Sequence, residues 1–288
     1  MTTLRERMIE DMQLRGFSPR TQQSYARAVR KLAEHYHKSP DRITEEELRQ
    51  YFLFRKNVSR WSRVACTIAL CGIKFFYENT LKRDWTTIGL VKPKREKSRL
   101  PVVLSVEEVR RTLKCVHMFR HRVCLTTIYS CGLRLTEGRT LQIPDVDSDR
   151  LFLHIHGKGG KDRYVPLPPR TLELLREIWK THRHKQWLFP APGRSGRGEA
   201  TADLPMPVAS VQIALKEALA KARVHKKASV HTLRHSYATH LLEQGVDLRI
   251  IQQILGHTSC QTTMVYTQLT EPALKPATEI INRLMADL

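Results

Sequence analysis

The sequence predicts a mainly α-helical protein of two domains, a small domain of four helices and a larger helical domain with a small antiparallel β-sheet. Three observations predict this class. Apolar residues recur at helical spacing through the first ninety residues, a basic segment with prolines follows, and one later segment alternates like a β-hairpin. With 288 residues, 41% of them hydrophobic, the chain is long enough for two such cores.

Four helices are expected within residues 1–91, the smaller domain. Ser18 and Pro19 supply an N-cap followed by proline at the first helical position, and Thr44 with Glu47 makes a capping box. Each signal marks the start of a helix with an apolar stripe. The residues expected to face this core are Leu4, Met8, Met12, Tyr25, Val29, Leu32, Tyr36, Leu48, Tyr51, Phe52, Trp61, Ala65, Ile68, Phe75 and Phe76.

Residues 92–102 are predicted to form a basic linker. Residues 92–99 hold five basic side chains against one acid, and prolines stand at positions 93 and 101. Two interpretations stay open, a solvated tether and a strap that lies along phosphates. The candidate phosphate contacts of such a strap are Lys92, Lys94, Arg95, Lys97 and Arg99.

Residues 103–288 are expected to form the larger domain. A capping box of Ser105 and Glu108 starts it, and a Gly-rich loop at residues 193–207 interrupts it. Helical patterning resumes at Val208 and continues to the end of the chain. The sheet is therefore a minor part of a helical domain.

The hairpin is expected at residues 151–167, with its turn at residues 158–161. Its first strand alternates, so that Leu151, Leu153 and Ile155 face one side while the histidines at 154 and 156 face the other. We interpret both histidines as residues of the outer strand face.

The charge balance predicts a polyanionic partner. Lys and Arg number 49 against 28 Asp and Glu, a formal net charge of +21. Residues 1–99 hold 22 basic and 11 acidic side chains, and the remainder holds 27 and 17. Both halves are basic, which indicates a chain that meets its partner along its whole length.

Membrane insertion and secretion are not expected. No apolar run approaches the roughly 18–20 residues that span a bilayer, and the N-terminus lacks the apolar core of a secretory signal. The cysteines form no CxxC pair, so we interpret them as reduced core thiols and expect a cytoplasmic protein. They are Cys66, Cys71, Cys115, Cys124, Cys131 and Cys260.

The stretch HTLRH, residues 231–235, raises a metal hypothesis, because two histidines four apart on a helix can bind one ion. A zinc-protease helix would need a glutamate after the first histidine, and Thr232 stands there. No third ligand is indicated, and nearby Lys and Arg oppose a cation. We therefore expect neither a metal nor another cofactor.

The same stretch fits a phosphate site. A phosphodiester gains negative charge on its non-bridging oxygens in the transition state, and arginine binds such oxygens through its planar, two-pronged group. Arg134, within CGLRLTEG, and Arg234, within HTLRH, are the two candidates. The sequence suggests no carboxylate cluster that would hold Mg²⁺ in their place.

Four motifs together resemble the tyrosine recombinase (phage integrase) family: CGLRLTEG, GKGGKDRYVPLP, HTLRHSYATHLLEQG and IIQQILGHTSCQTTMVYTQL. The likeness covers about residues 103–270, and the first domain with its linker resembles the family's core-binding, DNA-clasping domain. The resemblance implies the tyrosine recombinase fold. It also implies a site-specific DNA recombinase for integration, excision or resolution of mobile DNA, of the minimal two-domain Xer-like or transposon-borne type.

Three residues would carry the proton and bond transfers by this resemblance. Tyr266 would be the nucleophile that forms a 3′-phosphotyrosyl link and frees a 5′-hydroxyl. His231 would accept the tyrosine proton or donate to the phosphate, and Lys158 would be the general acid for the leaving oxygen.

The remaining site residues would hold the phosphate or support those that do. Arg134, Arg234 and His257 would bind the non-bridging oxygens. Glu137, one turn after Arg134, is expected to orient that side of the site, with an ordinary surface ion pair as its alternative. His235 is assigned a supporting role.

Other residues compete for these roles. Tyr237 could replace Tyr266, but its segment is patterned as a buried helix, so we interpret it as a packing residue. Lys161 shares the hairpin turn with Lys158, and we place it with Arg163 among the DNA-binding candidates. After the glutamate, Gly138 and the arginine beside it depart from the family's apolar run, which puts local packing in question.

The expected partner is double-stranded DNA carrying a specific recombination site, bound by a homotetramer in the synaptic complex. A related recombinase could also share the complex. Alternatives are relaxation of DNA by a type IB topoisomerase and a DNA-binding regulator that does not cut. The apolar stripe of the last helix, Ile280, Ile281, Leu284 and Leu288, could pack on its own domain or on a neighbouring protomer.

Overall fold

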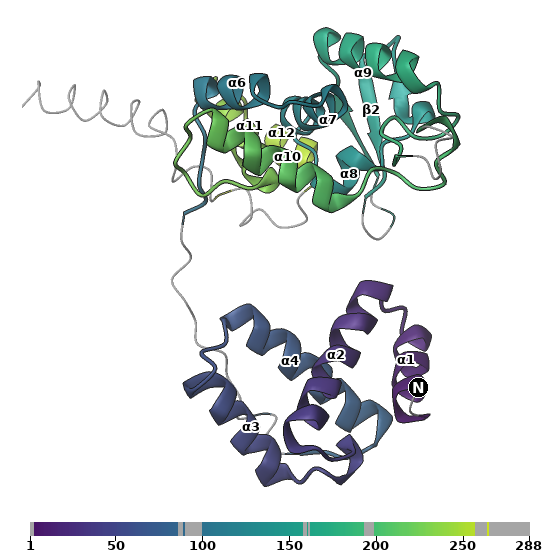
Figure 1. Ribbon diagram of the computed structural model, residues 1–288, viewed down its shortest axis with the longest axis vertical. Helices are drawn as coiled ribbons and strands as arrows, with labels where there is room; N and C mark the ends of the chain where they lie inside the picture. The colour runs from purple at the N-terminus through teal and green to yellow at the C-terminus, as the bar shows by residue number, and fades with distance from the viewer. Residues whose placement is uncertain are drawn as a thin grey trace, which may run out of the picture. The chain divides into compact units, whose positions relative to one another are not determined.

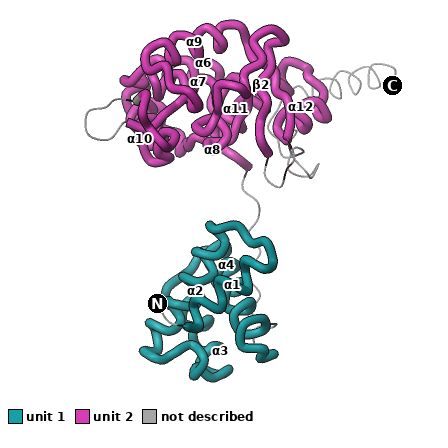
Figure 2. The backbone as a smooth tube through the Cα atoms, turned by 90° about the vertical axis from the view of Figure 1, so that its right-hand side faces the viewer, with its two compact units in different colours: residues 1–98 teal, residues 99–288 magenta. Residues whose placement is uncertain are grey.

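The computed structural model describes residues 3–85, 89, 100–157, 160, 162–192, 199–256 and 264. The chain divides into two compact units, residues 1–98 and residues 99–288 (Figure 2). The division falls inside the segment 92–102 that the composition suggested as a linker. We call the first the helical unit and the second, which holds the residues expected to be catalytic, the catalytic unit.

The helical unit contains the four predicted helices, α1 Thr3–Leu14, α2 Pro19–Tyr36, α3 Glu45–Asn57 and α4 Arg63–Phe75 (Figure 1). A short 3₁₀ turn, η1 Pro40–Arg42, precedes α3, and a π-helical turn, η2 Phe76–Thr80, follows α4. The start signals are confirmed. The Ser18 hydroxyl accepts a hydrogen bond from the backbone of Thr21, and Thr44 and Glu47 make both bonds of a capping box.

The predicted face of the fourth helix is partly wrong. Ala65 and Ile68 are exposed, and the buried face of α4 carries Ala69, Gly72 and Ile73 instead. The reason is the close packing of α4 on α2, where a Cβ on Gly72 would lie 2.9 Å from the Cα of Tyr25. A glycine at the crossing lets the two backbones approach, and this contact sets the helix rotation.

The described part of the catalytic unit contains seven α-helices: α6 Val106–Lys114, α7 Phe119–Ser130, α8 Leu135–Arg139, α9 Pro169–His182, α10 Val208–Lys221, α11 Val230–Glu243 and α12 Leu248–Leu255. Short 3₁₀ turns, η3 Ile143–Asp145 and η5 Glu199–Thr201, lie between them. Helix α7 is central and packs against α6, α8, α9, α10 and α11 (Figure 1). The capping box of Ser105 and Glu108 at the start of α6 is confirmed.

The predicted hairpin forms the larger part of a three-stranded antiparallel sheet. Strands β1 Val146–Asp147, β2 Phe152–Ile155 and β3 Arg163–Pro166 pair in that order, with Leu153 opposite Val165. Leu153 is buried as expected. Leu151 is not a strand residue, because its backbone has a φ of +58° just before β2, and it is only half-buried.

Five of the six cysteines lie in the described part of the chain, and all five are free thiols. Cys124 and Cys131 are buried in the core of the catalytic unit, as expected for core thiols, but Cys71 is exposed. Cys260 lies outside the described residues. Within the described residues, no helix is both long and apolar enough to cross a membrane.

Candidate active site

Three elements of the catalytic unit, α8, β3 and α11, bring arginines to one carboxylate, that of Glu137. Arg134 is the N-cap residue of α8, Arg163 lies in β3, and Arg234 lies in α11. We call these four residues the arginine cluster. Glu137 and Arg134 are one helical turn apart, so the short helix α8 presents both to the same side.

Glu137 is bonded by two arginines and lies close to a third. Its Oε1 accepts hydrogen bonds from Arg134 Nη1 at 2.7 Å and from Arg163 Nη1 at 3.1 Å. Its Oε2 accepts from the Arg134 backbone N–H at 2.8 Å and from Arg163 Nη2 at 2.9 Å. Arg234 Nη1 lies 3.7 Å from the same Oε2. Because the side chain of Glu137 is only 8% exposed, it is not an ordinary surface ion pair.

The pKa of Glu137 reflects two opposing causes. Burial opposes ionisation, but the hydrogen bonds from Arg163 and Arg134 and their charges outweigh burial and lower the pKa to about 2. Glu137 is therefore an anion at neutral pH. It offsets part of the positive charge that three arginines bring together.

The position of Arg163 corrects a prediction. It was expected among the basic side chains that meet DNA, but its guanidinium is buried, bidentate on Glu137, and donates through Nε to the carbonyl of Ile254 at 2.7 Å. Arg163 thus ties β3 to α8 and to the end of α12. Its role in this geometry is to position Glu137 rather than to reach a phosphate.

Gly256, the glycine of the LGH motif, brings the end of α12 against the cluster. It ends the helix with a φ of +63°, and a Cβ there would lie 3.0 Å from Arg163 Cδ. Its carbonyl accepts a hydrogen bond from Arg134 Nη2 at 3.4 Å. Glycine is favoured at this left-handed position, and the residue after it, His257, begins the segment outside the described residues.

The two arginines predicted to bind phosphate differ in accessibility. The Arg134 side chain is 38% exposed, whereas that of Arg234 is 1% exposed. Arg234 donates from Nη1 to the Gly132 carbonyl at 2.8 Å and from Nη2 to the Leu255 carbonyl at 2.6 Å. It thereby joins the turn between α7 and α8 to the end of α12, and Arg134 presents the more open guanidinium.

The turn that carries Arg134 depends on Gly132. This residue has a φ of +60°, and a Cβ would lie 2.6 Å from the ring of Tyr237 on α11. The interpretation of Tyr237 as a packing residue is confirmed, since its ring lies against this turn and burial raises the pKa of its hydroxyl to about 12. Gly132 therefore sets how closely the turn approaches α11.

His231 and His235 lie one turn apart on α11 and pack edge to face, with ring centroids 4.5 Å apart and an angle of 81° between the ring planes. Burial, followed by the charges of Arg234 and Arg134, lowers the pKa of His231, although its side chain keeps contact with solvent. Burial, and then His231 itself, lowers the pKa of His235 to about 4. Both imidazoles are therefore neutral at pH 7, the form in which a histidine can accept a proton.

The sequence matches known families over most of its length. Residues 103–272 match the profile of the Phage integrase family, and residues 4–87 match that of the Phage integrase N-terminal SAM-like domain. The chain belongs to the phage integrase family.

Named relatives of this family member are recombinases. It is 41% identical over 270 residues to the putative integrase/recombinase y4qK of Sinorhizobium fredii, covering 93% of this chain and 85% of that protein. It is 32% identical over 290 residues to tyrosine recombinase XerA of Pyrococcus furiosus, covering 98% and 96%. The chain is therefore a tyrosine recombinase that cleaves and rejoins DNA, and topoisomerase or regulator alternatives are not favoured.

Solved structures show the same fold. The crystal structure of XerA recombinase matches at 26% identity with a TM-score of 0.53, covering 96% of this chain and 97% of that one. A lambda integrase dimer bound to a core site matches with a TM-score of 0.71 at 14% identity, covering 92% and 94%. The XerH recombinase bound to a palindromic difH substrate matches with a TM-score of 0.68 at 24% identity, covering 91% and 80%. The last two likenesses bear on the fold alone.

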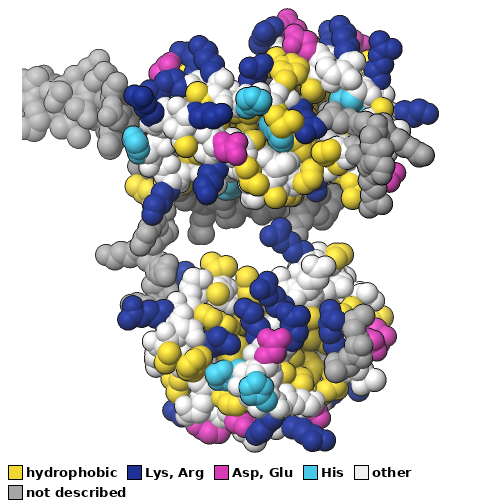
Figure 3. All heavy atoms as spheres, viewed as in Figure 1, with side chains coloured by type: hydrophobic (Ala, Val, Ile, Leu, Met, Phe, Trp, Pro, Cys, Tyr) yellow, Lys and Arg dark blue, Asp and Glu magenta, His cyan; other side chains and the backbone are white. Residues whose placement is uncertain are grey.

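Several predicted site residues of this recombinase lie outside the described residues. They are the catalytic candidates Lys158, His257 and Tyr266, the turn residue Lys161, and the linker residues Lys92, Lys94, Arg95, Lys97 and Arg99. Among those that the structure does describe, Arg134, Glu137 and Arg234 lie in the arginine cluster, and His231 and His235 lie on α11 with Arg234. Their catalytic roles stay predictions. Lysine and arginine side chains are also spread over the visible face of each unit (Figure 3).

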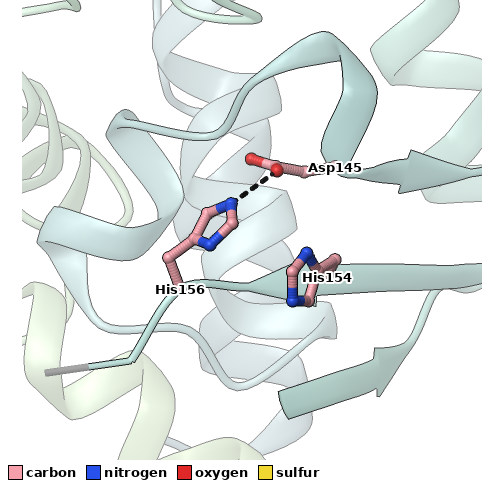
Figure 4. A group of neighbouring side chains, drawn as sticks. All are labelled: Asp145, His154 and His156. Atoms are coloured by element: carbon pink, nitrogen blue, oxygen red, sulfur yellow. Dashed lines mark hydrogen bonds and ion pairs between the residues drawn. The ribbon is translucent and has the colours of Figure 1, made fainter. Parts of the chain in front are cut away.

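The sequence left one feature of the recombinase open and led to a wrong expectation for another. The open question was the packing at Gly138 and Arg139: a Cβ on Gly138 would lie 2.4 Å from Ile128, and Arg139 donates to the Met206 carbonyl at 2.9 Å. The close contact with Ile128 explains why a glycine fits at position 138, and the hydrogen bond gives Arg139 a defined partner. His156 is not an outer strand residue, because it follows the end of β2 and its Nε2 lies 2.9 Å from Asp145 Oδ1 (Figure 4).

Proposed function

We propose that the chain recombines DNA at specific sites through a 3′-phosphotyrosyl intermediate on Tyr266, with Arg134, Lys158, His231, Arg234 and His257 as its other catalytic residues. One observation carries the proposal. The arginine cluster holds a partly exposed guanidinium, that of Arg134, in a fixed orientation beside a neutral His231. A phosphodiester needs such a combination of anion-binding and proton-accepting groups.

The proposed cleavage step is a transesterification. The hydroxyl oxygen of Tyr266 bonds to phosphorus, its proton passes to His231, and the bond from phosphorus to the 5′ oxygen breaks as Lys158 gives that oxygen a proton. Arg134 and His257 offset the charge that develops on the non-bridging oxygens. Arg234 adds positive potential and keeps the end of α12, and hence the start of the segment with His257, in place.

Rejoining would reverse these steps with a 5′-hydroxyl from another strand as the nucleophile. One phosphodiester is exchanged for one phosphotyrosine and then restored, so the sequence of steps is nearly isoenergetic and consumes no nucleotide. Exchange between two duplexes requires four cleavages, so we propose a tetramer on two specific DNA sites.

The nucleophile can be tested on DNA from the organism that encodes the chain. The protein is incubated with fragmented genomic DNA, covalent complexes are trapped by denaturation, and the attached ends are sequenced and the linked peptide identified. We expect DNA joined to Tyr266 at a small set of related sequences. Tyr266→Phe should abolish the adduct, while Tyr237→Phe, which removes the same atom from a packing residue, should keep it. An adduct that persists in Tyr266→Phe would contradict the assignment.

The two interpretations of the linker can be separated by salt dependence. Alanine at Lys92, Lys94, Arg95, Lys97 and Arg99 should lower the slope of log binding constant against log salt concentration by roughly 0.9 for each phosphate that the linker no longer neutralises. A control with arginine at Lys92, Lys94 and Lys97 keeps the charge and should keep the slope. An unchanged slope in the alanine variant would show that the linker does not contact phosphates and is a solvated tether.

A further inference from the structure

The base of the β2–β3 hairpin gathers a second group of chemically active side chains. Asp145 ends η3, His154 lies in β2, and His156 follows the end of that strand (Figure 4). One ligand atom from each lies within 4.8 Å of the others. Asp162, the residue before β3, contacts both histidines. We call these four residues the histidine cluster.

We propose that Asp145, His154 and His156 bind a divalent transition-metal ion, and that Zn²⁺ is the ion their donor atoms favour. Two imidazoles and one carboxylate are a common protein ligand set for zinc and for iron, with further positions left to water. Mg²⁺ and Ca²⁺ prefer oxygen ligands and are disfavoured by the two nitrogens.

The spacing fits an ion of this size. Zinc lies about 2.0–2.2 Å from nitrogen and carboxylate oxygen, which at tetrahedral angles separates two ligand atoms by roughly 3.3–3.5 Å. The separation of His156 Nε2 from Asp145 Oδ1 is 2.9 Å, and all three ligand atoms fall within 4.8 Å. Small rotations of the His156 and Asp145 side chains would therefore give these two atoms the separation that zinc ligands have, with the ion in place of the hydrogen that they now share.

The carboxylate ligand is already oriented. The Asp145 side chain is buried, and its Oδ2 accepts a hydrogen bond from the backbone N–H of Gln142 at 2.8 Å. This leaves Oδ1 directed at His156. A carboxylate held in this way loses little conformational freedom when it binds an ion.

Asp162 supplies the outer support that metal-binding histidines usually have. Its Oδ2 lies 3.2 Å from His156 Nδ1 and 3.2 Å from His154 Nε2. With Nδ1 of His156 donating to Asp162, Nε2 is the nitrogen that faces Asp145 and the ion. The His154 ring also stacks on Tyr164, with centroids 5.0 Å apart, which limits its rotation. A bound dication would offset the negative charge of the two carboxylates.

The histidine pair of α11 is the competing place for a metal in this chain. His231 and His235 also lie ring against ring, but Arg134 and Arg234 raise the positive potential there. Among the described residues, the group of Asp145, His154 and His156 is the one whose ligand atoms come together in the required number. The experiment must therefore distinguish the two histidine pairs.

Zinc binding is measured on the full chain after its metals have been removed with a chelator. Titration calorimetry with ZnCl₂, and metal counting after gel filtration, should give one ion per chain. His156→Ala should remove this binding, and Asp162→Asn should weaken it by roughly 10–100-fold, as expected when an outer partner is removed. His225→Ala, a change at an exposed histidine elsewhere, and the double variant His231→Ala/His235→Ala should bind as the wild type does.

Three results would overturn the proposal: no zinc bound by the wild type, equal binding by wild type and His156→Ala, or loss of binding in the α11 double variant alone. His156 is 57% exposed, so its replacement should not unfold the chain, and circular dichroism checks this. Co²⁺ absorption spectra of the wild type provide a measurement that needs no variant. Nitrogen and oxygen ligation is expected, and a thiolate charge-transfer band would assign the ion to a cysteine instead.

Discussion

Glu137 and Asp145, two buried carboxylates of the catalytic unit, differ in the side chains that surround them. Glu137 lies among Arg134, Arg163 and Arg234, whereas Asp145 lies beside His156 in the histidine cluster. Both carboxylates also cap a short helical turn through a backbone N–H, that of Arg134 for Glu137 and that of Gln142 for Asp145. Similar local structures thus support two kinds of site.

The chemical difference lies in what each partner can exchange. Arginine keeps its proton at every pH at which the chain is folded and is a poor metal ligand, so the three arginines of the arginine cluster keep one charge state and exclude a metal ion. Imidazole can give up a proton and take a metal ion in its place. The comparison suggests that the arginine cluster is a permanent scaffold for phosphate chemistry, while the histidine cluster is open to exchange.

Removing the charge of Glu137 should give the largest effect. Glu137→Gln leaves three guanidinium groups without their common anion, and loss of one partner from a buried ion pair costs about 3–5 kcal/mol of unfolding free energy. DNA cleavage should fall as well, because Arg134 loses its orientation. Urea unfolding measures the cost. Glu107→Gln, at an exposed pair with Arg110, is the matched control and should cost less than about 1 kcal/mol. Equal losses of unfolding free energy in the two variants would show that Glu137 is no more important for stability than an exposed glutamate.

Acid should weaken the same interaction. The pKa of Glu137 is lowered to about 2 from an ordinary 4.5, so its contribution to stability is present above about pH 4.5 and is lost as the pH falls toward 2. The difference in unfolding free energy between the wild type and Glu137→Gln should therefore shrink by about 2 kcal/mol between roughly pH 5 and pH 3. Urea unfolding at a series of pH values measures it. A constant difference would mean that the carboxylate is not held as an anion.

The turn beneath Arg134 should be sensitive to a single methyl group. Gly132→Ala places a Cβ within 2.6 Å of the Tyr237 ring at a position of positive φ, whereas Gly245→Ala has positive φ with nothing within 4 Å. Both variants place an alanine at a position of positive φ, so the difference between their stabilities measures the cost of the clash with Tyr237. We expect Gly132→Ala to be less stable than Gly245→Ala by about 1–3 kcal/mol. Thermal or urea unfolding of both variants measures this difference. Equal stabilities would show that the turn moves to accommodate the added methyl group.

The elements that could be predicted from sequence are those whose signals are local. Ser18 with Pro19, and Thr44 with Glu47, fix helix starts within four residues, and the alternation around Leu153 fixes a strand. The rotation of α4 could not be predicted in this way, because it depends on Gly72 meeting Tyr25 on another helix. Periodicity gave the helix, and the partner helix decided which face is buried.

The same limit applies to the site. The neighbourhood of Arg134, His231 and Arg234 followed from family motifs, but the burial of Arg163 did not, because its partner Glu137 lies 26 positions earlier in the chain. The contact between Asp145 and His156 likewise joins a 3₁₀ turn to the end of a strand. Their pairing depends on the fold, although the acids on both sides of the two histidines were a signal that could have suggested it.

The smallest effect should come from the same chemical change made in the histidine cluster. Asp162→Asn, like Glu137→Gln, replaces a carboxylate by its amide, but the Asp162 side chain is 41% exposed and His156 keeps its bond to Asp145. Solvent screens the charge that is removed, so with a chelator present the variant should lose much less unfolding free energy than Glu137→Gln does. Urea unfolding in parallel with Glu137→Gln makes the comparison direct. A cost as large as that of Glu137→Gln would show that the histidine cluster is itself a rigid scaffold without any metal, and the distinction between the two carboxylates would fail.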